Sequence, residues 1–472
     1  MSGTAVAQAP PVAATSSPPV PAASPLGAAA LPDEPPKLTV SDPMLAPMPP
    51  PQHVITSWED AARMMRERST DLQSSYADIR RAEADSRTAL AGVMPTLNGT
   101  GTASHTILPK ANGGSVIDTG TAAGATLLPT GGGGGRNSLT GSIRLSVPLI
   151  DVRAWHALGT AKVNEEGARL DYQNLERTTA ASLASAIAVN VTAERVSELG
   201  RVGLRNALER LALTQAKERT GTATGLDIVR ARQDVAQARS QLVTSDEALR
   251  KSRDALGLAL GLTEPVGVVQ STDLSAIRDG VLKSCRQLPK IDERADLLAA
   301  DKTVEVAHRR RVEVDQSFLP TLSAGSTLTE SISDSGAPGR TNWNVQAVLN
   351  VPIWDGGVRY GQRRNAAAVE DQSALARESL RRTTTVNLVQ ARRNVDVAEE
   401  SRRVSEEVRQ LAFEVDRLTR AAYQTGKGTS LDLITSAAAL RQAELDLAVD
   451  ELGLVQAKIA SLLTLADCSV AK

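Results

Sequence analysis

The sequence predicts a mainly helical protein with a small β-sheet, built from one helix–strand–strand–helix–helix unit that occurs twice. Two observations predict this fold class. Short motifs recur in one order along the chain: MPTLN at 94–98 as LPTLS at 319–323, LSVPLID at 145–151 as LNVPIWD at 349–355, and TGTATGLDI at 220–228 as TGKGTSLDL at 425–433. Between them, long stretches carry helical heptads, whereas strict apolar–polar alternation is confined to short segments. Repetition in a fixed order indicates a tandem duplication.

The N-terminal segment and the composition limit what the chain can form. Residues 1–56 are expected to be a disordered Pro/Ala-rich segment, because they hold most of the 23 prolines. Only 2 Phe, 4 Trp and 4 Tyr occur in 472 residues, which argues against a large globular core. The net charge of -1 gives no bias towards nucleic acid, and 4 His with 2 Cys offer little for a metal site. We therefore expect no cofactor, no metal and no nucleic-acid partner.

Helix, strand and turn signals divide the chain into two repeats. Ser57 is a plausible N-cap for the first helix, and Gly and Pro residues interrupt the helical pattern between the repeats. The first repeat, 57–262, is expected to contain a helix to about 93, strands at about 96–107 and 138–149, and a hairpin with its tip near 221. After an equatorial linker at 263–289, the second repeat, 290–465, is expected to contain a helix to about 317, strands at about 320–331 and 342–353, and a hairpin with its tip near 426. Residues 466–472 are expected to be a tail.

The predicted strands each have one apolar and one polar face. In the strand at 138–149, one face carries Leu139, Gly141, Ile143, Leu145 and Val147. Helices that lead away from the strands leave this face uncovered, and a sheet with one apolar face and fully paired edges is typical of a membrane barrel. Four strands are too few to close a barrel, whereas three chains supply twelve. The sequence contains no run of about 18 apolar residues that would indicate a transmembrane helix.

Heptads and helix lengths predict a long helical wall. After the first tip, apolar residues recur every seven positions at Ile228, Val235, Leu242, Leu249 and Leu256. A helix at about 154–220 spans roughly 100 Å, which the helices at about 225–262 and 290–317 match when placed end to end. In the second copy, about 356–424 is matched by 430–464 together with 57–93. The broken helices and both ends of the ordered core are therefore expected to meet in a belt at mid-height.

The two cysteines are predicted to lie close together in this belt. Cys285 belongs to the linker, and Cys468 follows the last helix, which ends at the same height. Both a disulfide and a pair of free buried thiols are compatible with the sequence.

The duplicated motifs at 147–151 and 351–355, LPTL at 319–322, and the tip motifs at 219–227 and 423–432 resemble those of the TolC-like outer-membrane efflux proteins. The resemblance covers about 57–465. It implies a homotrimer with a twelve-stranded barrel in outer-membrane lipid and a twelve-helix tunnel that extends into the periplasm. It also implies an exit duct of an efflux or type I secretion system, gated at the helix tips. The expected partners are a periplasmic adaptor protein and an inner-membrane pump of RND or ABC type.

The resemblance assigns roles to individual residues. Gly221 and Gly426 mark the tips, Asp227 and Asp432 match pore-side aspartates, and Tyr423 matches a tyrosine that tethers the closed tip. Two positions depart from the family: Gly428, beside Lys427, stands where an arginine is frequent, and Thr435 replaces a second aspartate. The remaining expected residues are Gly225, Leu226 and Leu431 at the tips that face the adaptor, and Pro148, Asp151, Pro352 and Asp355 at the strand–helix turns.

Alternatives remain at both the site and the function. An aspartate in the first turn of a helix is commonly a cap, so the sequence is compatible with Asp227 and Asp432 as caps, as pore residues, or as both. The chain shows no nucleophile–base pair, metal cluster or phosphate-binding loop, so it is not expected to be an enzyme. A soluble, elongated coiled-coil scaffold is the alternative function, although that class needs no alternating strands.

Overall fold

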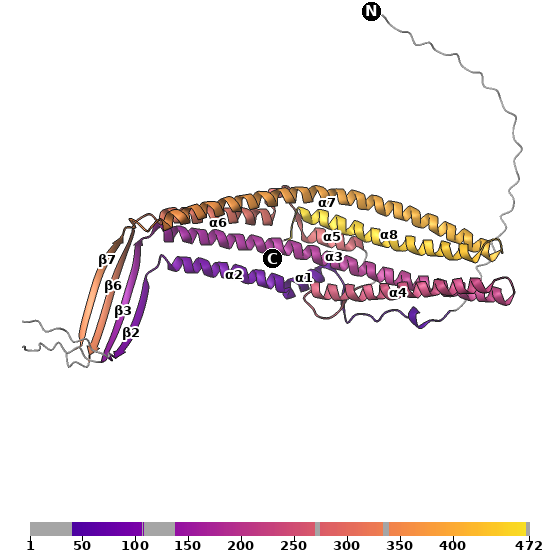
Figure 1. Cartoon of the computed structure of the whole chain (residues 1–472), viewed down its shortest axis with the longest axis horizontal. Coiled ribbons are helices and arrows are strands. Elements are labelled where there is room, and N and C mark those ends of the chain that lie inside the picture. Colours follow the sequence, from indigo (N-terminus) through magenta and orange to yellow (C-terminus); the bar gives the residue numbers. More distant parts are fainter. Residues whose placement is uncertain (1–39, 106, 108–136, 270–273, 334–338, 469–472) are drawn as a thin grey trace, which may run out of the picture.

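The helices of the chain run side by side along one rod, with a four-stranded sheet at one end and two hairpin tips at the other (Figure 1). This architecture is seen in a computed structural model that describes residues 40–105, 107, 137–269, 274–333 and 339–468. The predicted fold class, mainly helical with a duplicated unit and a small β domain, is confirmed. The expectations for residues 1–39 and 469–472 lie outside the described residues.

Two long hairpins form most of the rod. The first consists of α3 (Val152–Arg219) and α4 (Gly225–Ala259), and the second of α7 (Val358–Gln424) and α8 (Ser430–Thr464). The heptad residues Val235, Leu242, Leu249 and Leu256 are buried, as a coiled-coil seam requires. No helix of the described residues is both long enough and apolar enough to cross a membrane.

The N-terminal helical stretch is broken into α1 (Trp58–Arg68) and α2 (Thr70–Ala91), whereas the sequence analysis expected one helix. Ser69 causes the break, because its Oγ accepts the backbone N–H of Leu72 at 3.4 Å and thereby caps a new helix. Gly261, at φ 74°, lies directly against this break, and a Cβ there would stand 2.6 Å from the carbonyl oxygen of Arg68. Only glycine allows the two backbones to approach so closely.

The short helices stack in a different order from the one predicted by length. Helix α2 packs on α3 and continues the line of α4, while α6 (Ala295–Gln316) packs on both α3 and α7 and continues the line of α8 (Figure 1). The sequence analysis placed the helix at 290–317 in line with α4, and the helix at 57–93 beside the second hairpin. Both predicted alignments are wrong. Two short helices of equal length fit either position equally well, so helix lengths alone could not distinguish the two arrangements. Side-chain packing alone decides between them.

The sheet has the order β2–β3–β6–β7, and all neighbouring strands are antiparallel. Its strands are β2 (Thr96–His105), β3 (Asn137–Ile150), β6 (Thr321–Ser333) and β7 (Arg340–Asn350). The register places Ile143 opposite Gly99 and Leu328, so apolar residues of different strands share one face. That face is exposed in the single chain, with Leu139 at 55% and Ile143 at 51%. Among the described residues, the edge strands β2 and β7 have no outer partner strand.

The predicted belt lies where the short helices meet. It contains a parallel pair of β1 (His53–Ile55) with β4 (Val266–Val268), the helix α5 (Leu274–Ser284), the short 3-10 helix η2 (Ile291–Glu293), and an antiparallel pair of β5 (Arg286–Gln287) with β8 (Ala466–Asp467). The main hydrophobic core is here and joins distant segments of the chain, for example Trp58 of α1, Leu183 of α3, Leu256 of α4 and Leu463 of α8.

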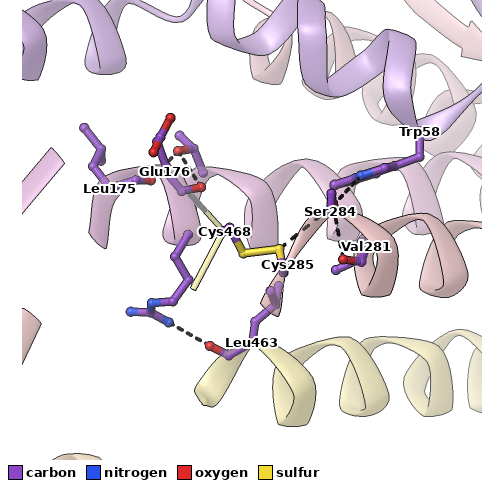
Figure 2. The surroundings of a disulfide bond; sticks show 10 residues. Trp58, Leu175, Glu176, Val281, Ser284, Cys285, Leu463 and Cys468 are labelled. Carbon is purple, nitrogen blue, oxygen red and sulfur yellow. Dashed lines mark hydrogen bonds between the residues drawn. A yellow bond between two sulfur atoms is a disulfide. The ribbon is translucent and has the colours of Figure 1, made fainter. Parts of the chain in front are cut away.

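A disulfide joins Cys285 to Cys468 inside this core (Figure 2). The predicted proximity of the two cysteines is confirmed, and the question left open by the sequence is decided in favour of the bond. The Nε1–H of Trp58 donates to Ser284 Oγ at 2.9 Å beside it. The bond and the β5–β8 pair fasten the end of the second repeat to the linker that precedes it.

Residues 40–52 form an N-terminal strap along the first hairpin, although they belong to the segment expected to be disordered. The strap includes the 3-10 helix η1 (Pro43–Leu45). Asp42 accepts a hydrogen bond from Arg239 Nη2 at 2.6 Å, and the carbonyl oxygen of Pro49 accepts one from Arg253 Nη1 at 2.9 Å. Met44 packs against the buried seam of α3 and α4. These contacts hold residues 40–52 in a defined conformation, although their composition alone indicates disorder.

Candidate functional site at the hairpin tips

Both hairpins reverse direction at a glycine with left-handed backbone. Gly221 has φ 74° and Gly426 has φ 76°, a region that residues with a side chain rarely adopt. The N–H of Thr222 bonds to the carbonyl oxygen of Lys217 at 2.9 Å, and the N–H of Lys427 bonds to that of Ala422 at 2.9 Å. The two tips therefore end their first helices with the same glycine-dependent cap.

The two predicted aspartates close capping boxes at the start of the returning helices. Asp227 Oδ2 accepts the N–H of Thr224 at 2.9 Å, while Thr224 Oγ1 accepts the N–H of Asp227 at 3.3 Å. In the same way, Asp432 Oδ2 accepts the N–H of Thr429 at 3.3 Å, while Thr429 Oγ1 accepts the N–H of Asp432 at 3.2 Å. These hydrogen bonds favour the carboxylate form.

Hydrogen bonding lowers the pKa of both aspartates. For Asp227 the hydrogen bond from Ser430 is the main cause of the lower pKa, followed by the bonds from Thr224. For Asp432 the hydrogen bond from Thr429 is the main cause of the lower pKa. Both side chains therefore carry negative charge at neutral pH.

Side chains at the tips also tie the two hairpins to each other. Ser430 Oγ of the second hairpin donates to Asp227 Oδ1 of the first at 2.5 Å. Lys217 Nζ donates to the carbonyl oxygen of Tyr423 at 2.5 Å and lies 3.8 Å from the centre of its ring. Tyr423 is only 6% exposed, and its hydroxyl has no hydrogen-bond partner among the described residues. Burial lowers the pKa of Lys217.

The sequence analysis predicted Tyr423 and Asp227 but missed their partners Lys217 and Ser430. The internal repeat could have drawn attention to Ser430, because Ser430 aligns with Gly225 at the start of the other returning helix. Lys217 carries no such signal.

The other predicted tip residues lie as follows. Gly225 begins α4, and the side chains of Leu226 and Leu431 are exposed at equivalent positions of the two repeats. Lys427 and Gly428 belong to the second turn, where a Cβ on Gly428 would lie 3.0 Å from the backbone nitrogen of Tyr423. The hydroxyl of Thr435 donates to the carbonyl oxygens of Leu431 and Asp432 in its own helix.

One heptad above Asp227, a buried ion-pair network forms a further link between the hairpins. The side chain of Asp234 is 2% exposed and accepts hydrogen bonds from Arg210 Nη2 and from Arg441 Nη2, both at 2.7 Å. Arg210 belongs to the same hairpin and Arg441 to the other. Gly203 makes room for the second arginine, because a Cβ there would lie 2.9 Å from Arg441 Cδ. The sequence analysis missed this network, since each residue reads as an ordinary charged helix position.

The predicted strand–helix turns have local roles. Pro148 lies at a register shift in β3, and Asp151 caps α3 by accepting the N–H of Ala154 at 2.9 Å. Asp355 accepts the N–H of Gly357 at 3.0 Å and Arg359 Nε at 2.7 Å, and the carbonyl oxygen of Pro352 accepts from Arg359 Nη1 at 3.4 Å. These contacts fix the backbone locally where the strands pass into the helices. In the part of the chain that the structure describes, no cluster of His, Cys, Asp and Glu could hold a metal ion.

Comparison with known proteins defines the class to which this architecture belongs. The family described as Outer membrane efflux protein matches residues 61–262 and 290–465, and the chain therefore belongs to this family. The predicted resemblance to TolC-like outer-membrane efflux proteins is confirmed. The protein is an outer-membrane channel that extends into the periplasm, which decides against the alternative of a soluble scaffold.

Individual relatives are distant but cover most of the chain. It is 23% identical over 407 residues to the pyoverdine export outer membrane protein OpmQ of Pseudomonas putida, covering 84% of this chain and 82% of that protein. It is 26% identical over 343 residues to nodulation protein T of Rhizobium leguminosarum bv. trifolii, covering 67% of this chain and 69% of that protein. Among solved structures, the outer membrane protein VceC of Vibrio cholerae has a TM-score of 0.69 at 16% identity, covering 86% of this chain and 95% of VceC. CusC has a TM-score of 0.72 at 17% identity, covering 90% and 98%.

Proposed function

We propose that this chain forms a homotrimeric exit duct of a tripartite export system. Its expected partners are a periplasmic adaptor and an inner-membrane pump of RND or ABC type. Cargo would leave through a tunnel of helices and a twelve-stranded barrel, and the hairpin tips would control entry. The duct itself would be passive.

The open edges and the uncovered apolar surface of the single chain carry the proposal of a trimer. Strands β2 and β7 end the sheet without outer partners among the described residues, and unpaired edges of this length are a liability unless another chain covers them. On α7, one stripe of the helix is apolar and exposed: Val397, Val404, Val408, Leu411, Val415 and Leu418. This spacing is that of a coiled-coil seam without a partner helix. Three copies placed side by side would cover both the edges and the seam.

The oligomeric state tests this part of the proposal. Light scattering in a neutral detergent should give the mass of a trimer. Leu411→Asp, which places a charge in the seam, should shift the mass towards the monomer. Gln410→Asp adds the same charge one residue away, off the stripe, and should leave the trimer intact. A stable wild-type monomer or dimer would refute the proposal.

The tip carboxylates support a role in entry control. Asp227 and Asp432 of three chains would supply six negative charges at one end of the tunnel, and rings of carboxylates favour cations in other pores. We expect Asp227→Ala/Asp432→Ala channels to lose cation selectivity and block by multivalent cations in planar bilayers. Thr435→Ala, one turn from Asp432 on the same helix, removes no charge and should change neither property. Unchanged selectivity in the double variant, with trimers intact, would leave the aspartates only as helix caps.

The exposed leucines at the tips support docking of the adaptor there. The side chains of Leu226 and Leu431 are exposed at equivalent positions of the two hairpins. Neither is buried in its own hairpin, so both apolar side chains are available for contact with a partner. Leu226→Lys should abolish export in cells while the purified trimer stays intact. Leu258→Lys is a matched control, because Leu258 is the same residue type, is also exposed on the same helix, and lies at its belt end. Full export by Leu226→Lys would place the adaptor elsewhere.

A further inference from the structure

A cation-rich groove lies between the two hairpins, next to the belt. It has a volume of about 900 Å³. Its walls come from the helices α3, α4, α5, α7 and α8, from Val269 just after β4, and from Pro47 and Met48 of the N-terminal strap. A cavity of this size lies in the range of small-molecule sites, roughly 300–1,000 Å³. The groove is far from the hairpin tips and from the sheet, so it is separate from the residues on which the proposed export function rests.

Basic side chains from five helices converge on this groove. They are Arg195, Arg201, Arg253, Arg278, Arg402 and Lys458. Only three acidic residues line it with them: Glu194, Glu198 and Glu451. Like charges gathered around one space repel each other unless an anion lies among them. The lining therefore favours a negatively charged ligand.

Two of these arginines are buried and keep spare hydrogen-bond donors. Arg201 is 5% exposed and Arg253 is 7% exposed. The Nη2 of Arg201 bonds to Asp246 at 2.8 Å, and the Nη1 of Arg253 bonds to the carbonyl oxygen of Pro49 at 2.9 Å. The Nε of each has no acceptor among the described residues. A guanidinium has five donors, and an unsatisfied buried donor is costly, so an acceptor in the groove would stabilise both residues.

Arg402 is the one cation of the set without an ion pair among the described residues, although its charge helps to lower the pKa of Glu399 and Glu406 on the same helix. Each of the other five basic residues makes an ion pair, for example Arg195 with Glu451 and Lys458 with Glu399. Among the described residues, Arg402 makes none. It lies on the side of α7 opposite the exposed apolar stripe, so the proposed trimer contact leaves it free. Arg402 is therefore the residue whose charge a ligand would neutralise first.

Apart from Thr192, the rest of the lining is apolar, with Val191, Leu249, Leu454 and Val455 on three different helices. We propose that the groove is a binding site for a small anionic amphiphile, with a phosphate or carboxylate headgroup at Arg402 and an apolar portion against these side chains. A ligand there would contact both hairpins and the strap. Its binding would hold these elements together and raise the thermal stability of the protein.

Titration calorimetry on the full-length protein in a neutral detergent tests the proposal, with octyl phosphate as the probe. We expect saturable binding that weakens with added salt. Inorganic phosphate, which lacks the chain, and octyl glucoside, which lacks the charge, should bind much more weakly. Arg402→Gln should weaken octyl phosphate binding by at least about tenfold, the effect typical of losing a hydrogen bond to a charged group. Arg392→Gln, an exposed arginine of the same helix outside the groove, should bind as the wild type does.

Three results would overturn the proposal. Equal affinity for inorganic phosphate and octyl phosphate would exclude the amphiphile. Equal affinity of wild type and Arg402→Gln would place binding elsewhere, as would an absence of saturable binding in the wild type. Arg402 has no ion pair to break within the described residues, so its variant should fold, and an unchanged circular dichroism spectrum confirms this. Because export is not measured, the outcome is independent of the proposed channel function.

Discussion

Removal of the belt disulfide should strongly destabilise the chain. The bond joins Cys285 to Cys468 across a sequence separation of 183 residues. In the chain-entropy account, cross-linking ends so far apart restricts the unfolded state by about 5 kcal/mol at 25 °C. Both cysteines are buried in the main core, so serine would add the cost of a buried hydroxyl. The Cys285→Ala/Cys468→Ala variant removes the bond without that complication.

Chemical denaturation, compared at equal protein concentration, is the appropriate measurement. We expect the variant to lose several kcal/mol of unfolding free energy and to become insensitive to reducing agent. The wild type should lose a similar amount when it is unfolded and refolded under reducing conditions. The β5–β8 pair and the hydrogen bond from Leu288 N–H to the carbonyl oxygen of Leu465 at 2.9 Å should still hold the native ends together. A change below about 1 kcal/mol would refute the argument from chain entropy.

Three further predictions concern the tips and the links between hairpins. Asp234→Ala leaves Arg210 and Arg441 buried without their counter-charge and should cost about 3–5 kcal/mol in denaturant unfolding; a loss near zero would show that water screens the site. The pKa of Asp227 lies below its usual value of 3.8, so its stabilising effect is present above that pH and is lost as the pH falls through the lowered pKa. Asp227→Asn should therefore flatten the acid side of the stability profile, and identical profiles would contradict this. Gly426→Ala, at φ 76°, should destabilise by about 1 kcal/mol in thermal melts, whereas a neutral result would mean that the turn relaxes.

Much of the fold could be predicted because its signals are local. Period-two alternation located the strands to within a few residues, as in β3, and prolines and glycines marked where helices end. The heptad at Val235, Leu242 and Leu249 identified a seam that is indeed buried. The duplication then placed the second set of elements, since each motif appears again in the same order. Cysteine proximity followed from the positions of Cys285 and Cys468 at helix ends of equal height.

The candidate site was predicted only in part, because its cross-hairpin partners depend on how the helices face each other. Asp227 and Asp432 could be found from the capping pattern and the tip motif. The bonds from Ser430 to Asp227 and from Lys217 to the backbone of Tyr423 join residues about 200 positions apart, and no local pattern connects them.

The sequence by itself determined the elements, their duplication and the faces that must be covered, since these depend on the chemistry of neighbouring residues. Only the tertiary structure decided which short helix continues which. It placed α2 in line with α4, whereas length and periodicity fitted α2 and α6 equally well to that position. It also ordered the strap, because Asp42 and Met44 gain contacts with the first hairpin that exist only after that hairpin has formed. The physical reason is the same in both cases: the deciding energy comes from contacts between distant segments.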